Sequence, residues 1–151
     1  MPRILVIEDE ELLRNLYSEL LEMKGFQVET AADGKTALEH LNDTRKPDLI
    51  LLDINMPEMD GVEFLRVIKS NDKLKRVPVI LLTGVIQVEK ISAGLDMGAV
   101  GYIEKANSPV EVMSKIEMIL GAVLSSYGNK KNEMTTGPKK IREKEIELQS
   151  A

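Results

Sequence analysis

The chain contains 151 residues, of which 43% are hydrophobic and 30% are charged, a composition typical of one ordinary globular domain. The sequence lacks cysteine, which excludes a disulfide scaffold, a thiolate zinc site and a cysteine nucleophile, and its single histidine, His40, excludes a histidine-rich metal centre. The apolar runs are far shorter than the ~20 residues of a membrane-spanning helix, and the N-terminus has no signal-peptide pattern. We therefore expect a soluble, cytoplasmic protein without membrane contact.

The charge is unevenly distributed along the chain. Residues 1–124 contain 14 Lys or Arg against 21 Asp or Glu, whereas residues 125–151 contain 6 against 4. Affinity for nucleic acid depends largely on neutralising phosphates with basic side chains. An acidic body without a basic stripe therefore predicts no direct nucleic-acid contact from this chain.

Short apolar runs alternate with segments of helical period, which is typical of a parallel sheet with helical connections. The runs predict strands at residues 4–7, 27–30, 48–52, 79–82 and 100–103. The first, third and fourth runs are almost wholly apolar, as expected for strands that are buried on both faces. The predicted fold class is α/β: a flavodoxin-like, doubly wound sheet of five parallel strands in the order 2-1-3-4-5, with five helices.

Apolar residues at helical spacing predict five helices, caps included, over about 12–23, 33–40, 62–69, 88–97 and 108–124. Gly25 is a plausible stop after the first helix. Ser108, Pro109 and Glu111 form a capping box with proline at the first position of the fifth. The composition then changes, so we predict one domain over 1–124 and, over 125–151, a polar linker with a weakly helical charged tail.

Polar side chains follow four of the predicted strands. Glu8 and Asp9 follow the first strand, Asp53 the third, Thr83 the fourth and Lys105 the fifth. Ligands of open parallel sheets bind beyond the carboxyl ends of the strands, so these side chains are expected to converge. Neighbouring carboxylates repel one another unless a cation lies among them, and oxygen ligands of this kind suit magnesium. The sequence therefore predicts a Mg²⁺ site at this edge.

Four short motifs lie in order on these strand ends: ILVIED at 4–9, DINMPEMDG at 53–61, LLTG at 81–84 and GAVGYIEK at 98–105. Each motif alone is weak, but the four in this order are highly specific. On these residues the chain resembles a receiver domain of the bacterial response-regulator family, over residues 3 to about 122. The expected unit is therefore a receiver domain within 1–124.

The resemblance implies one step of a two-component phosphorelay, in which a sensor histidine kinase or a phosphotransfer protein passes a phosphoryl group from phosphohistidine to Asp53. It also implies that Glu8, Asp9, Asp53 and the backbone carbonyl of Asn55 hold Mg²⁺, while Lys105 neutralises the phosphoryl oxygens. A carboxylate can attack phosphorus, and this transfer depends mainly on positioning and charge neutralisation. Such a protein is a phosphoacceptor that is expected to dephosphorylate itself, not a turnover enzyme.

Two further residues resemble the switch of this family. The resemblance implies that the Thr83 hydroxyl turns toward the phosphoryl group and that Tyr102 swings inward behind it. The surface of the fourth helix, fifth strand and fifth helix would then change for an unknown downstream protein target. The plainer alternative is that Thr83 caps the fourth helix and Tyr102 lies half-buried on an edge strand.

Ala106 departs from the family pattern, and Val85 and Gly61 carry two further expectations. Ala106 stands where the family pattern has a proline, and a cis bond before a non-proline residue costs ~3 kcal/mol, so we expect a trans Lys105–Ala106 bond. Val85 offers no polar group to orient a water, although Asn55 on the other flank could still help, which predicts slower self-dephosphorylation than in a Val85→Glu variant. Gly61 is interpreted mainly as an ordinary turn residue.

Three alternatives remain open. The first is a magnesium-dependent phosphohydrolase of the haloacid-dehalogenase type, although Asn55 stands where such enzymes have a second acid and no cap domain is evident. The second is a flavodoxin-like cofactor binder, although no glycine-rich phosphate loop follows the first strand. The third is a receiver fragment of a longer regulator whose output domain is absent.

Overall fold

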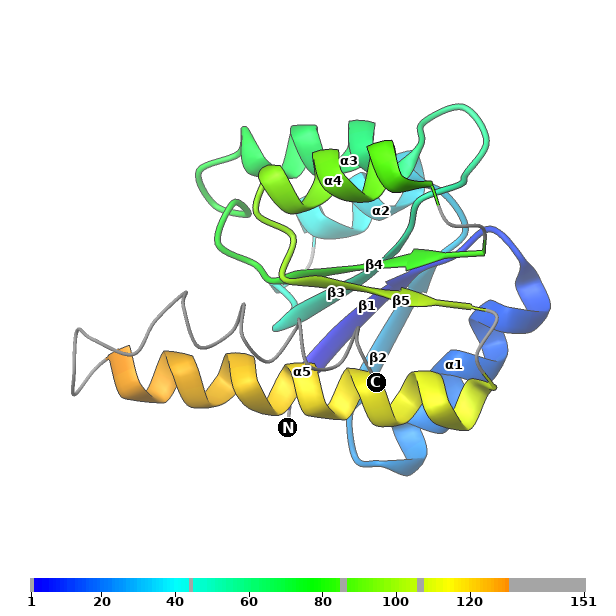
Figure 1. The fold of residues 1–151 in the computed structure, drawn as a ribbon, viewed down its shortest axis with the longest axis vertical. Coiled ribbons are helices and arrows are strands. Elements are labelled where there is room, and N and C mark those ends of the chain that lie inside the picture. The colour runs from blue at the N-terminus through cyan, green and yellow to red at the C-terminus, as the bar shows by residue number, and fades with distance from the viewer. Residues whose placement is uncertain (1, 44, 85–86, 106–107, 131–151) are drawn as a thin grey trace.

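The computed structural model describes residues 2–43, 45–84, 87–105 and 108–130. These residues form three layers, in which a central parallel sheet carries helices on both faces (Figure 1). The strand order is β2-β1-β3-β4-β5, and every neighbouring pair is parallel. The fold class and strand order predicted from the sequence are confirmed.

The strands agree with the predicted runs to within one residue at either end. They are β1 (Arg3–Ile7), β2 (Gln27–Ala31), β3 (Leu49–Asp53), β4 (Val79–Thr83) and β5 (Gly101–Glu104). Strands β3 and β4 are buried at every position, whereas β2 and β5 are partly exposed edge strands. Burial on both faces accounts for the continuous apolar runs of the central strands.

The helices lie on the two faces of the sheet: α1 (Glu11–Met23) and α5 (Pro109–Lys130) on one, and α2 (Gly34–Asp43), α3 (Gly61–Lys69) and α4 (Val88–Asp96) on the other (Figure 1). Each face has its own core. Tyr17 of α1 packs in the core beneath α1 and α5, and Phe64 of α3 packs in the other. None of the helices in the described ranges is long and apolar enough to cross a membrane.

The helix ends follow the predicted signals. The Asp33 carboxylate accepts a hydrogen bond from the Thr36 N–H at 2.7 Å before α2. The Ser108 hydroxyl accepts one from the Glu111 N–H at 3.3 Å at the start of α5. Gly25 has a φ of 93° just beyond α1, a conformation that favours glycine at a helix end.

The last helix is longer than predicted. A linker is expected from residue 125, but α5 continues to Lys130. A helix that is already formed and packed extends at little cost, because each added residue gains a hydrogen bond without a new nucleus. Residues 131–151, with the predicted charged tail, lie outside the described residues, so the domain boundary stays a prediction.

Candidate functional site

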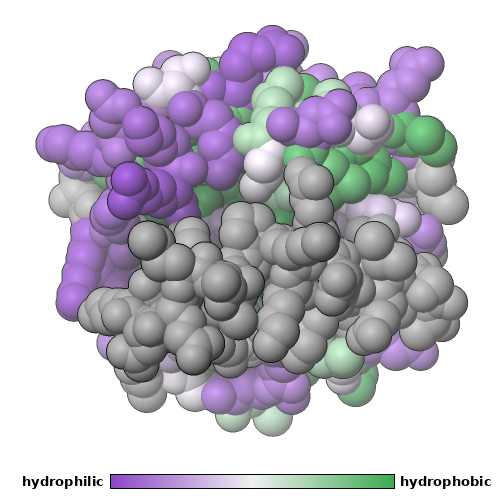
Figure 2. All heavy atoms as spheres, turned by 60° about the vertical axis from the view of Figure 1, so that its left-hand side comes forward, coloured by the Kyte–Doolittle hydropathy of each residue, from purple (hydrophilic) through white to green (hydrophobic). Residues whose placement is uncertain are grey.

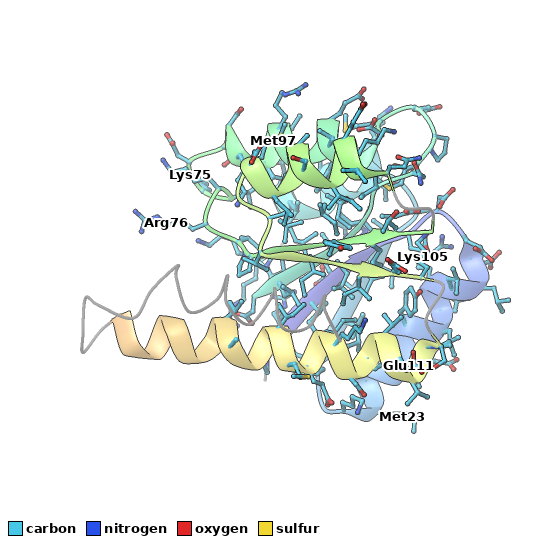
Figure 3. All side chains as sticks on the ribbon, viewed as in Figure 1. Met23, Lys75, Arg76, Met97, Lys105 and Glu111 are labelled. Atoms are coloured by element: carbon cyan, nitrogen blue, oxygen red, sulfur yellow. The ribbon has the colours of Figure 1, made fainter. Side chains whose placement is uncertain are left out.

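The carboxyl edge of the sheet brings the predicted side chains together. Glu8 directly follows β1, Asp53 ends β3, Thr83 ends β4 and Lys105 directly follows β5. Strands β1, β3, β4 and β5 are consecutive neighbours in the sheet, so these residues lie along one edge. Figure 3 shows Lys105 at this end of the sheet. The expected convergence at the strand ends is therefore present.

The three carboxylates form a compact cluster. Glu8, Asp9 and Asp53 each offer an oxygen, and these oxygens lie within 4.8 Å of one another. Glu8 and Asp53 are 0% and 1% exposed, whereas Asp9 is exposed. The site thus consists of two buried carboxylates, those of Glu8 and Asp53, and the exposed carboxylate of Asp9 at its opening.

Lys105 supplies a positive charge in direct contact with this cluster. Its Nζ atom lies 2.6 Å from Glu8 Oε1 and 3.0 Å from Asp53 Oδ2. Apart from these ion pairs, both Glu8 carboxylate oxygens and Asp53 Oδ2 are buried without a hydrogen bond in the described part of the chain. One ammonium group cannot balance three carboxylates, and unsatisfied buried oxygens are costly. The geometry therefore fits a hard cation with oxygen ligands.

The ionisation of the cluster reflects this excess of acid. Burial first, and then the hydrogen bonding and charge of Glu8, raise the pKa of Asp53 from 3.8 to about 8, against the opposing charge of Lys105. Burial alone would raise the pKa of Asp9, but contact with the Asp53 and Glu8 carboxyls and the charge of Lys105 lower it. Burial also disfavours the charged form of Lys105, yet Glu8 and Asp53 together raise its pKa.

The loop after β3 fixes the Asp53 carboxylate. The Asn55 N–H donates to Asp53 Oδ1 at 3.1 Å, and the Gly61 N–H donates to the Ile54 carbonyl at 2.8 Å. A Cβ atom on Gly61 would lie 2.6 Å from the Asp53 carbonyl oxygen. Only glycine allows this approach of α3 to the end of β3, so Gly61 does more than form the ordinary turn expected of it.

The same loop contains one unusual backbone conformation. Glu58 has a φ of 68°, and the Met59 N–H donates across it to the Pro57 carbonyl at 2.8 Å. This is a three-residue turn in a region that side-chain-bearing residues rarely occupy. Glu58 is exposed, and because it is neither glycine nor asparagine, its residue type does not signal the turn.

The two predicted switch residues lie on β4 and β5. Thr83 is completely buried at the end of β4. Tyr102 is partly buried on β5 and packs against the core beneath α2, α3 and α4. Their placement is compatible with a switch and with the plainer structural roles, so the switch remains a prediction.

Arg14 of α1 is a residue that the sequence interpretation missed. Its Nη1 atom donates to the Glu8 carbonyl at 3.0 Å and lies 3.4 Å from the Asp9 carbonyl. It therefore holds the backbone of the acidic loop from the helix side. The only sequence signal was a cation near a helix N-terminus, where the helix dipole favours acids.

A second missed contact joins α3 to α4. Asp60 caps α3, because its Oδ1 atom accepts from the Glu63 N–H at 2.9 Å, and its Oδ2 atom lies 3.3 Å from Lys90 Nζ. Lys90 is in the first turn of α4. This ion pair links α4 to the loop that follows Asp53, and its partners are too distant in sequence to be paired by pattern.

Two predictions fall on positions that the structure does not describe. The Lys105–Ala106 peptide bond involves Ala106, and the argument on self-dephosphorylation involves Val85; both residues lie outside the described ranges.

Sequence comparisons place the chain among known proteins. A profile of the response regulator receiver domain matches residues 4–117. The phosphate regulon transcriptional regulatory protein PhoB of Escherichia coli is 38% identical over 118 residues, which are 78% of this chain and 51% of that protein. The alkaline phosphatase synthesis transcriptional regulatory protein PhoP of Bacillus subtilis is 37% identical over 118 residues, or 78% of this chain and 48% of that protein. The chain spans about half the length of these curated relatives.

Solved structures share the fold. The chemotaxis protein CheY4 of Vibrio cholerae has a TM-score of 0.71 and 33% identity, covering 78% of this chain and 97% of that chain. The Mn²⁺-bound form of the response regulator Rcp1 has a TM-score of 0.69 and 29% identity, covering 79% and 91%. The phosphorylated cyanobacterial phytochrome response regulator RcpA has a TM-score of 0.69 and 32% identity, covering 77% and 89%.

The matched residues include the whole carboxyl edge with its acidic cluster. Receiver domains are phosphoacceptors in signalling rather than turnover enzymes, they generally bind Mg²⁺ at an acidic pocket, and they work with sensor histidine kinases. The chain belongs to the response regulator receiver domain family of two-component systems.

Proposed function

We propose that Asp53 accepts a phosphoryl group from the phosphohistidine of a sensor histidine kinase or phosphotransfer protein, with Mg²⁺ as cofactor. One observation carries this proposal: Asp53 is buried at the end of a central strand, 3.0 Å from Lys105 Nζ and clustered with Glu8 and Asp9. A nucleophilic carboxylate, a cation and additional acids are the groups that such a transfer needs.

Magnesium fits the residues that are present. Both Glu8 carboxylate oxygens and Asp53 Oδ2 are buried without a hydrogen bond in the described residues, and Asp9 lies at the opening of the cluster, so we assign the three side chains and the Asn55 carbonyl as its ligands. When bound, the ion offsets negative charge on the carboxylates and on the phosphoryl oxygens. A cation here would also favour the ionised, nucleophilic form of Asp53. The similarity to Rcp1, whose solved structure is a Mn²⁺-bound form, supports this assignment.

The chain's own groups act on the transfer as follows. A carboxylate oxygen of Asp53 forms a bond to phosphorus while the phosphorus–nitrogen bond of phosphohistidine breaks. The departing electron pair stays on the imidazole nitrogen of the kinase. The Asn55 N–H holds Asp53 Oδ1, and the ammonium group of Lys105 neutralises the transferred oxygens beside it. Self-dephosphorylation by water would later break the acyl phosphate.

The proposed readout is a change of surface. The buried Thr83 hydroxyl would respond to the phosphoryl group, and Tyr102 would move in the space behind it, altering α4, β5 and α5. A local charge can bias a two-state element in this way. The downstream partner would be a protein, and we propose no direct nucleic-acid contact from this chain.

The length of the relatives bears on the output. PhoB and PhoP are named as transcriptional regulators and are about twice as long as the matched region. We propose that this receiver acts through protein contacts, either by itself or as the receiver part of a longer regulator. The cytoplasm is the proposed compartment, because transcriptional regulators act where DNA is.

The test is labelling with a small phosphodonor in the presence of Mg²⁺, followed by intact-mass measurement. One phosphoryl group should be incorporated by the wild-type protein, none by the Asp53→Asn variant, and very little after magnesium removal or in Asp9→Ala. The exposed Asp96 provides a matched control, because Asp96→Asn should be labelled like wild type. Undiminished labelling of Asp53→Asn would overturn the assignment. Sustained turnover of a chromogenic phosphoester would favour the phosphohydrolase alternative instead.

A further inference from the structure

The end of the sheet opposite the acidic cluster contains a hollow of about 620 Å³. It lies between the end of α2 and the α3–β4 loop and is lined by Leu41, Asn42, Lys46 and residues 71–76. Figure 3 shows Lys75 and Arg76 pointing outward at the opposite end from Lys105. Figure 2 brings this end forward and shows hydrophilic residues gathered on its upper part. We call this feature the cationic hollow.

Positive charge dominates the lining of the cationic hollow. Among the described residues, the lining contains four basic side chains, those of Lys46, Lys73, Lys75 and Arg76, and one acid, Asp72. Lys75 Nζ lies 3.1 Å from Asp72 Oδ1, in a pair whose carboxylate is 94% exposed and therefore weakly held. In the described part of the chain, Lys46 and Lys73 form no ion pair. The net positive charge of the hollow contrasts with the acidic excess of residues 1–124.

Helix dipoles explain only part of this charge. Helices α2 and α3 both end near the cationic hollow, and cations stabilise helix C-termini. Helix α3 already has Arg66 and Lys69 in its last turn. Lys46 and Lys73 lie beyond the two helices, outside the turn in which the dipole effect is significant. Their charge is therefore available for a ligand.

The form of the hollow indicates the class of ligand. Compact phosphates are usually held by converging N–H groups at a helix N-terminus, whereas the helices here end in carbonyl groups. The cations are exposed and spread around an open depression, and the lining includes the apolar Leu41 and Leu74. An extended chain with several separated carboxylates matches this arrangement better than one compact anion.

We propose that the cationic hollow binds an extended acidic segment of a partner protein. The site lies at the opposite end of the sheet from Asp53, so a partner bound there leaves the carboxyl edge open to a kinase. Contacts between exposed charges depend strongly on salt, and they contribute more to specificity and association rate than to raw affinity. The partner would therefore be a transient one.

The probe is a hexaglutamate peptide, titrated into ¹⁵N-labelled full-length protein at low salt and followed by amide chemical shifts. Shifts are expected at Leu41, Asn42, Lys46 and 71–76, and they should vanish at high salt and with a hexaglutamine peptide. The Lys46→Glu/Lys73→Glu double variant should weaken binding by about tenfold or more. The Lys35→Glu/Lys115→Glu variant changes the total charge equally at sites away from the hollow, and should bind nearly as wild type.

Several outcomes would overturn the proposal. Equal weakening in both double variants would show a response to total charge only. Chemical-shift changes confined to other surfaces, or no changes at all, would show that hexaglutamate does not bind in the cationic hollow. Tighter binding of a single-stranded oligonucleotide than of hexaglutamate would assign the hollow to nucleic acid. If wild type fails to bind the peptide and Lys46→Glu/Lys73→Glu merely lowers the melting temperature, the cations contribute to stability and not to binding. Phosphodonor labelling of Asp53 is independent of all these readouts.

Discussion

The two ends of the sheet carry charge in opposite ways. At the carboxyl edge, Glu8 and Asp53 are almost completely buried and both lie within 3.0 Å of Lys105 Nζ. In the cationic hollow, charge is carried by exposed side chains such as Lys46 and Lys73. Buried charges are desolvated and act on one another strongly, whereas exposed charges are screened by water and salt. Substitutions at the carboxyl edge should therefore change stability and chemistry, while those in the hollow should change mainly binding.

The largest expected effect is the pH dependence of stability in magnesium-free buffer. The pKa of Asp53 is about 8 in the fold, against an ordinary value of 3.8. Between these two pH values the folded state therefore binds more protons than the unfolded state. The contribution of Asp53 to the free energy of unfolding is complete below about pH 4 and decreases as the pH rises toward 8. We expect a loss on the order of 2–4 kcal/mol by pH 7.

Urea unfolding at several pH values measures this loss. Asp53→Asn should be more stable than wild type at pH 7 and should lack most of the decline, because the amide carries no charge. Adding Mg²⁺ at pH 7 should stabilise the wild-type protein but not the Asp53→Asn variant. Asp96→Asn, at an exposed acid, should behave as wild type. If the stability of wild type and of Asp53→Asn changes with pH in the same way, burial at the carboxyl edge does not affect the ionisation of Asp53, and the contrast with the cationic hollow fails.

A second prediction tests whether backbone packing positions the buried charge. Gly61→Ala would place a Cβ atom 2.6 Å from the Asp53 carbonyl oxygen. Overpacking of this kind costs ~1–3 kcal/mol, and displacement of the Asp53 backbone should also slow phosphodonor labelling. Gly121→Ala is the matched control, because Gly121 is a glycine of α5 with nothing within 4 Å of its Cβ position. It should stabilise the protein by ~0.5–1 kcal/mol. Unchanged stability and labelling in Gly61→Ala would contradict this role.

The carboxyl edge was largely predictable from the sequence. Glu8, Asp53 and Thr83 adjoin the ends of apolar runs and Lys105 lies two residues beyond one, and parallel strands place all their carboxyl ends at one edge. The position of each residue at the end of a strand was therefore enough to predict its place in the fold. The strand order followed from burial, since the central runs are apolar on both faces while the second and fifth are more polar.

The remaining features depend on contacts that no local pattern specifies. The cationic hollow joins the end of α2 to the α3–β4 loop, and its lysines stand in ordinary polar loop sequence. The close approach at Gly61 depends on how α3 packs against the end of β3, which a turn pattern does not reveal. The length of α5 was underestimated because residues 125–130 are poor in apolar side chains, although an established helix extends through such residues.

A third prediction concerns Arg14, which acts on the acidic cluster through the backbone. Arg14→Met keeps the packing of the stem but removes the donors to the Glu8 and Asp9 carbonyls. Loss of such a hydrogen bond costs ~1 kcal/mol, so Mg²⁺ should bind about fivefold more weakly by calorimetry. Arg66→Met, at an exposed arginine of α3, should leave magnesium affinity unchanged. Equal affinities for Arg14→Met and wild type would show that the acidic loop holds its shape unaided.

The smallest expected effect lies in the ion pair between Lys90 and Asp60. Lys90 Nζ is 3.3 Å from Asp60 Oδ2, but the two side chains are 40% and 27% exposed, so Lys90→Met should change stability by less than about 0.5 kcal/mol. The same substitution at Lys105, whose side chain is 14% exposed, should have a larger effect, because it leaves Glu8 and Asp53 buried without their cation.

The ion pair between Lys90 and Asp60 nevertheless joins the first turn of α4 to the cap of α3. Hydrogen exchange at the start of α4 should therefore become faster in Lys90→Met while the central strands are unchanged. A loss of stability in Lys90→Met as large as in Lys105→Met would break the distinction between buried and exposed charge on which these predictions depend.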